Sequence, residues 1–134
     1  MMAMVADASV TVAWFVKGQA TDDTERLLDR ATRESVHVPS LWLPEFVDAL
    51  VTLERRRRLP ASEVDDALRA VADFDIITER DLGGGPALAA LARRYALTAY
   101  HARYLNLALR LKLPLACKDA SLRAAANRAG VKLA

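Results

Sequence analysis

The sequence has a single cysteine, Cys117, and it contains no apolar stretch of the ~18 residues that a membrane-spanning helix needs. One cysteine excludes an internal disulfide and any zinc site built from several cysteines, and it suits a reducing compartment. We therefore expect a cytoplasmic protein that does not associate with membranes.

The amino-terminal segment MMAMVADASVTVAWFVKG is apolar but lacks the basic start of a signal sequence, and Asp7 interrupts its apolar run. We interpret residues 4–6 as a buried strand instead. The chain has 19 basic and 17 acidic residues, a net charge of +2, which permits binding to nucleic acid without indicating it. Its 134 residues, 53% hydrophobic and 27% charged, predict one globular domain spanning residues 1–134.

Short apolar segments alternate along the chain with segments whose apolar residues recur at helical spacing. The expected strands are 4–6, 36–38, 74–78, 113–117 and 131–133. The expected helices are 9–15, 22–34, 43–56, 62–72, 86–95, 99–111 and 120–129. This alternation predicts an α/β fold of three αβα layers around a central, mostly parallel sheet of four to five strands.

Several polar residues stand where helices are expected to begin. Ser9, Thr21, Asp22, Ser62 and Thr98 are candidate caps, and the spacing from Asp22 to Glu25 resembles a capping box. The stretch Gly83-Gly84-Gly85-Pro86 reads as a flexible connection. It lacks the Gly-Lys-Ser/Thr ending of a phosphate-binding loop, so nucleotide binding is not expected.

Two acidic residues, Asp7 and Asp119, follow expected strands, and Glu45 begins the expected helix after Pro44. Open parallel sheets bind ligands just beyond the carboxyl ends of their strands. Each acid also has a plain structural interpretation, because an aspartate can cap a helix and an acidic first turn complements the helix dipole.

The order of these features resembles PIN domains, and VapC toxins in particular. It consists of an apolar strand before Asp7-Ala-Ser9, then Pro44-Glu45 opening a helix, then Leu-Thr-Ala-Tyr ahead of position 101, and a strand ending in Asp119. The similarity spans nearly the whole chain. It implies a PIN-like fold and a metal-dependent endoribonuclease toxin of a VapBC-type toxin-antitoxin system, hydrolysing RNA phosphodiesters with metal-activated water.

By this resemblance Asp7 and Asp119 bind Mg²⁺, or Mn²⁺, while Glu45 binds the metal or a water that it holds. Ser9 and Thr98 are supporting polar groups. Such hard cations prefer oxygen ligands and keep several waters, and a bound metal lowers the pKa of its water. The implied partners are the RNA substrate, a VapB-type antitoxin whose carboxyl-terminal segment covers the acidic site, and a second copy of the chain in a homodimer.

His101 occupies a catalytic position where the family has Asp. An imidazole removes one negative charge and suits zinc, manganese or nickel better than magnesium, so Mg²⁺ affinity should fall. Three explanations stay open: a natural loss or weakening of nuclease activity, an altered metal preference, and a change acquired in cloning, since one base converts an Asp codon to a His codon.

The alternative function is a catalytically inactive PIN-domain protein that binds RNA or an antitoxin. An aspartyl-phosphate phosphatase using Asp7 is disfavoured, because such enzymes need a second Asp where Ser9 stands. Asp48, where the family often has Asn, receives no catalytic role. Contacts with RNA phosphates are open to Lys118, but a solvated side chain is the simpler interpretation, as it is for the basic clusters Arg55–Arg58 and Arg93–Arg94.

Overall fold

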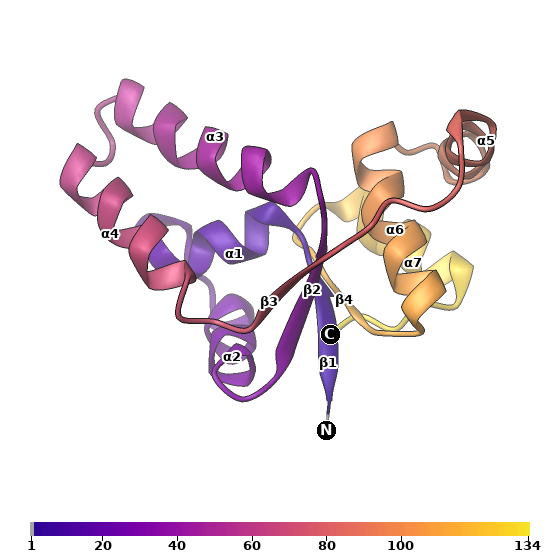
Figure 1. The fold of residues 1–134 in the computed structure, drawn as a ribbon, viewed down its shortest axis with the longest axis horizontal. Helices are drawn as coiled ribbons and strands as arrows, with labels where there is room; N and C mark the ends of the chain where they lie inside the picture. Colours follow the sequence, from indigo (N-terminus) through magenta and orange to yellow (C-terminus); the bar gives the residue numbers. More distant parts are fainter. Residues whose placement is uncertain (1) are drawn as a thin grey trace.

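A single sheet of four parallel strands forms the centre of the protein in the computed structural model, which describes residues 2–134 (Figure 1). The strands are β1 (Ala3–Ala6), β2 (Ser35–Pro39), β3 (Ile76–Glu79) and β4 (Leu115–Ala116). Their order is β3-β2-β1-β4, with Met4 opposite Val36 and Val5 opposite Leu115. The expected sheet is therefore confirmed, and it is parallel throughout.

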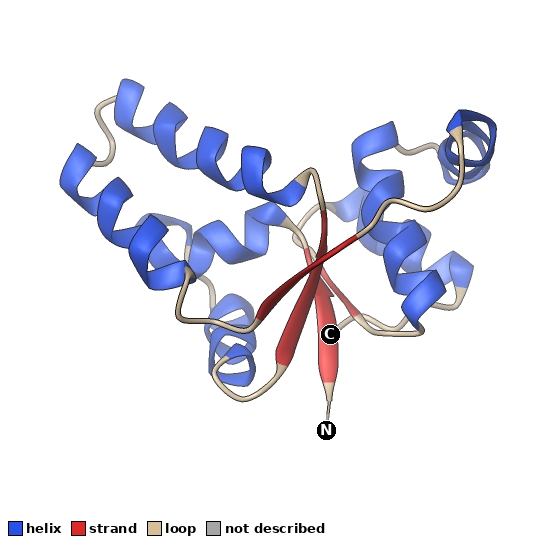
Figure 2. Ribbon diagram, in the orientation of Figure 1, coloured by secondary structure: helices blue, strands red, loops and turns tan. Residues whose placement is uncertain are grey.

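Helices cover both faces of this sheet (Figures 1 and 2). One face carries α1 (Ala8–Phe15), α2 (Asp22–Ala31), α3 (Trp42–Arg55) and α4 (Ala61–Val71), and a 3-10 turn at Lys17–Gln19 follows α1. The other face carries α5 (Gly85–Tyr95), α6 (Ala99–Leu111) and α7 (Ala120–Ala129). The predicted three-layer αβα architecture is confirmed.

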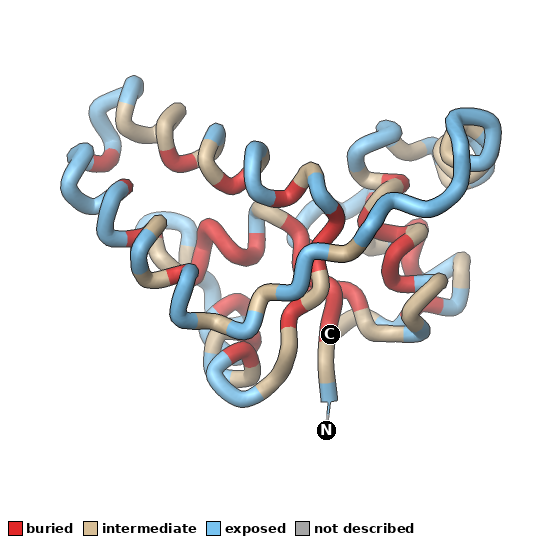
Figure 3. The backbone as a smooth tube through the Cα atoms, viewed as in Figure 1, coloured by how far each residue is buried: buried red, intermediate tan, exposed pale blue. Residues whose placement is uncertain are grey.

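The core lies between the sheet and the inward faces of the helices (Figure 3). Met4, Val5 and Ala6 of β1 are fully buried, because helices cover the central strand from both sides. From α6, Leu105 and Ala108 pack into the same core. Their burial fixes the rotation of α6 and so determines which of its side chains reach the sheet edge.

Four local expectations need correction. The expected strand at 131–133 is reduced to a single bridge between Leu133 and Leu115. Thr21 caps α2 as one of the expected candidates, but the capping box pairs it with Thr24, each hydroxyl accepting from the other residue's backbone N–H, instead of pairing Asp22 with Glu25. Ser9 and Ser62 lie inside α1 and α4, since Asp7 and Pro60 precede those helices.

Other helix ends follow the sequence. The Thr98 side chain caps α6 as expected, and Gly130 ends α7 with a φ of 79°, a left-handed conformation that glycine adopts without strain. Within residues 2–134, no helix combines the length and apolar character required to cross a membrane.

Candidate functional site

Five of the six predicted site residues meet at the carboxyl edge of the sheet. β1 and β4 are parallel neighbours, and the Asp7 N–H donates to the Ala116 carbonyl at 3.0 Å. The chain leaves β1 toward β2 on one side, while β4 lies on the other, so this edge is a topological switch point, where α/β sheets bind ligands. The cavity there, about 420 Å³, is lined by Asp7, Ala8, Ser9, Glu45, His101, Tyr104, Lys118 and Asp119.

Asp7 is placed by the transition from β1 to α1. It is 5% exposed, and its Oδ1 accepts hydrogen bonds from the Ser9 hydroxyl at 2.7 Å and from the Val10 N–H at 3.0 Å. Burial raises the pKa of Asp7 above its ordinary value, although these two hydrogen bonds act in the opposite direction. The Ser9 hydroxyl is thus bonded directly to the Asp7 carboxylate.

Glu45 reaches the cavity from the first turn of α3. Its Oε1 accepts a hydrogen bond from the Tyr104 hydroxyl at 2.7 Å. Burial raises the pKa of Glu45, and the negative charge of Asp7 raises it further. The charge of Asp7 therefore destabilises the ionised form of Glu45, while the hydrogen bond from Tyr104 stabilises it.

Asp119 caps α7, and its Oδ1 accepts from the Leu122 N–H at 2.9 Å. The Nδ1 of His101 lies 3.7 Å from the same oxygen. Position 101 is held there by its backbone, because its N–H donates to the Thr98 hydroxyl at 3.1 Å. Thr98 does not line the cavity, so its support is exerted through the helix cap.

The three carboxylates share one arrangement. In each, one oxygen is anchored by a protein donor: Oδ1 of Asp7, Oε1 of Glu45 and Oδ1 of Asp119. The second oxygen of each makes no hydrogen bond to another group within residues 2–134. Internal donors therefore orient the carboxylates while leaving an acceptor on each for a ligand.

The donor set suits a hard divalent cation, although the side chains do not form a closed cage. As placed, no three His, Cys, Asp or Glu side chains of residues 2–134 are grouped so as to hold a metal ion. Mg²⁺ does not need such a cage, because proteins usually bind it through one or two carboxylates and several waters. Asp7 and Asp119 fit that role, and Glu45 fits contact through water.

The remaining candidates are distributed differently. Lys118 lines the cavity, and its ammonium donates to the Gln19 carbonyl at 3.1 Å. Asp48 lines an adjoining cavity instead, which shares Ser9 and Glu45 with the first. The basic run Arg55–Arg58 is exposed beyond Glu45 by roughly 15 Å along α3, and Arg93 and Arg94 lie exposed on α5, so neither cluster belongs to the site.

Sequence reasoning missed Tyr104. At helical spacing among leucines and alanines it reads as an ordinary core position, and it is 1% exposed. A buried tyrosine hydroxyl usually finds a partner, and Tyr104 lies three residues after His101, on the same helix face. Those two signals could have found it.

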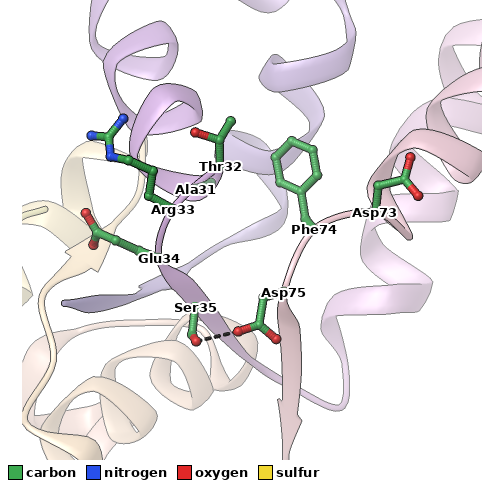
Figure 4. Close-up of a pocket in the computed structure, with 8 residues that line it drawn as sticks. All are labelled: Ala31, Thr32, Arg33, Glu34, Ser35, Asp73, Phe74 and Asp75. Carbon is green, nitrogen blue, oxygen red and sulfur yellow. Dashed lines mark hydrogen bonds between the residues drawn. The ribbon is translucent and has the colours of Figure 1, made fainter. Parts of the chain in front are cut away.

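A second acidic cavity lies where β2 and β3 begin, at the opposite edge of the sheet (Figure 4). Its acids are Glu34, Asp73 and Asp75. The Glu34 carboxylate accepts two hydrogen bonds from Arg30, at 3.0 and 3.1 Å, which lower its pKa. Asp75 accepts from the Ser35 hydroxyl at 2.5 Å. Adjacent donors thus satisfy two of its three acids.

Comparison with known proteins establishes the fold. The crystal structure of PAE2754 from Pyrobaculum aerophilum resembles this chain with a TM-score of 0.72 and 22% sequence identity, covering 92% of this chain and 79% of the other. No family model matches the sequence. No curated protein matches it either.

Proposed function

We propose that this chain is a metal-dependent endoribonuclease of the PIN type, a VapC-like toxin whose activity is weakened by His101. The observation that carries the proposal is the meeting of Asp7, Glu45 and Asp119 at the switch point of a parallel sheet. Within residues 2–134 none of the three forms an ion pair with a lysine or arginine. Excess negative charge of this kind favours a cationic ligand.

In this proposal, the role of each residue follows from its position in the cavity. Asp7 and Asp119 would hold Mg²⁺ or Mn²⁺ at the strand ends, and Glu45 would orient a water beside it. The bound metal would neutralise charge on the scissile phosphate and lower the pKa of that water. Lys118 is exposed at the cavity wall, and its ammonium would have to leave the Gln19 carbonyl to contact a neighbouring phosphate of the RNA.

His101 weakens this arrangement in two ways. A neutral imidazole supplies no negative charge, and a protonated one, 3.7 Å from Asp119, competes with the cation for that carboxylate. The same contact favours the second candidate function, a catalytically inactive PIN-domain protein that binds RNA or an antitoxin.

His101→Asp tests the two functions against each other. In the proposed nuclease, the variant binds Mn²⁺ more tightly and cuts single-stranded RNA ~10- to 100-fold faster than the parent chain, with EDTA abolishing cleavage. The measurements are isothermal titration with Mn²⁺ and the rate of RNA cleavage in Mg²⁺ or Mn²⁺. Asn106→Asp is the matched control, since it adds a carboxylate to α6 at a position that does not line the cavity.

A His101→Asp protein that folds, cuts no RNA with either metal and arrests no growth overturns the nuclease. Retained RNA binding by the parent chain would then support the binding protein.

The proposed setting is the cytoplasm, with RNA, a VapB-type antitoxin and a second copy of the chain as partners. Two exposed apolar side chains support a protein partner beside the site. Leu43 is 54% exposed two residues before Glu45, and Tyr100 is 66% exposed next to His101. An antitoxin segment over the cavity would cover both.

A further inference from the structure

Glu45 is held differently from the other two carboxylates. Asp7 and Asp119 are anchored by groups two or three residues away along the chain, as parts of their own helix caps. Glu45 is anchored by Tyr104, which lies 59 residues away on another helix, and the O···O distance is 2.7 Å. The orientation of Glu45 therefore depends on a tertiary contact between α3 and α6.

From these contacts we propose that Tyr104 is a positioning residue, which fixes Glu45 Oε1 so that Oε2 is presented to the ligand of the cavity. This proposal rests on the function proposed above, because it concerns the same site. Tyr104 is 1% exposed and packed in the core, so its hydroxyl has little freedom to follow Glu45 if that side chain moves.

The chemistry of a phenol makes the contact directional. A hydroxyl has one hydrogen, which here goes to Glu45, so only one carboxylate oxygen can be held. Burial and the nearby Glu45 raise the pKa of Tyr104 far above its usual range, which agrees with its role as the donor in this contact.

The position of Tyr104 on α6 also joins it to residue 101. Residues three apart on a helix share a face, and both His101 and Tyr104 line the cavity. One buried helix thus supplies a group facing Asp119 and a group holding Glu45. A rotation of α6 would disturb both carboxylates together.

The test compares Tyr104→Phe with Tyr95→Phe, each in the full-length His101→Asp chain. Both remove one phenol oxygen, but Tyr95 lies outside the cavity, with its ring against Arg94 and Arg128. Loss of an outer-shell donor predicts Mn²⁺ binding and kcat reduced about tenfold for Tyr104→Phe, with KM for RNA and the thermal unfolding midpoint close to those of Tyr95→Phe. Crystal structures of both variants report the orientation of Glu45.

The two proposals fail separately. Tyr104→Phe with unchanged Mn²⁺ affinity, unchanged kcat and Glu45 still in place overturns the positioning role while the nuclease stands. If the His101→Asp chain itself neither binds Mn²⁺ nor cuts RNA, the nuclease fails. The positioning role is then decided by the crystal structures alone: a reoriented Glu45 in Tyr104→Phe supports it, and an unmoved one overturns it.

Discussion

Each of the two edges of the sheet has a cavity with three acidic residues, but only the amino edge pairs one of them with an arginine. At the amino edge, the charged Arg30 pairs with Glu34 and lowers its pKa. At the carboxyl edge, burial raises the pKa of both Asp7 and Glu45, with no lysine or arginine paired to either within residues 2–134. The contrast teaches that uncompensated charge, and not the number of acids, distinguishes a candidate site.

The largest effect should come from removing the charge of Asp7 without removing its cap. Asp7→Asn keeps an oxygen for the Val10 N–H but loses the negative charge. In the His101→Asp chain, RNA cleavage should fall by more than the ~100-fold that outer-shell groups reach. Asp75→Asn makes the same chemical change at the amino edge and should leave the cleavage rate unaltered. An equal fall in the cleavage rate of both variants would contradict the assignment of the site to the carboxyl edge.

Stability should respond to pH with opposite sign at the two edges. The pKa of Asp7 is raised from its ordinary 3.8, so its ionisation opposes folding, and stability is lost as pH rises through the folded pKa. The pKa of Glu34 is lowered from 4.5, so its contribution is present above that value and is lost as pH falls through the folded pKa.

At pH 7 we therefore expect Asp7→Asn to raise the free energy of unfolding by about 1 kcal/mol. Glu34→Gln should lower it by about 1 kcal/mol, because Arg30 loses a charged partner. Urea denaturation at pH 7, and again at a pH below 3.8, measures both, and both differences should shrink at the lower pH. Two changes of the same sign at pH 7 would contradict the charge argument.

The smallest effect should come from Asp48→Asn. Asp48 lies on α3 beside Glu45, but it is exposed and lines the adjoining cavity. A surface change of this kind alters free energies by less than about 0.5 kcal/mol, so cleavage by the His101→Asp chain should change by no more than roughly twofold. A tenfold loss, measured with the same RNA substrate, would extend the site along α3.

Part of the candidate site could be predicted from the sequence, because the position of a residue after a strand determines at which edge of the sheet it lies. Asp7 and Asp119 follow buried strands, and parallel strands bring their carboxyl ends to one edge, so their meeting could be predicted once the alternation was read. Glu45 and position 101 came from the resemblance instead. Helical spacing alone gives no reason for them to face the same cavity.

Other features depended on tertiary contacts that local patterns do not encode. Tyr104 looked like a core residue because its phenol partner is 59 residues away. The expected strand at 131–133 failed because only Leu133 finds a bridge partner beside the two-residue strand β4. Ser9 looked like a cap, but Asp7 takes that place and uses the Ser9 hydroxyl as a donor.

The anchoring of the three carboxylates predicts that, among the residues of the site, a substitution is best tolerated at position 101. Asp7 and Asp119 each cap a helix, and Glu45 accepts from a buried phenol, so replacing any of them with a side chain that lacks an acceptor oxygen harms folding as well as the proposed chemistry. In the part of the chain that the structure describes, the His101 ring makes no closer polar contact than the 3.7 Å approach to Asp119, and the backbone cap by Thr98 is indifferent to the side chain. Within the proposed nuclease, a side-chain change that lowers activity without harming the fold is therefore expected first at this residue.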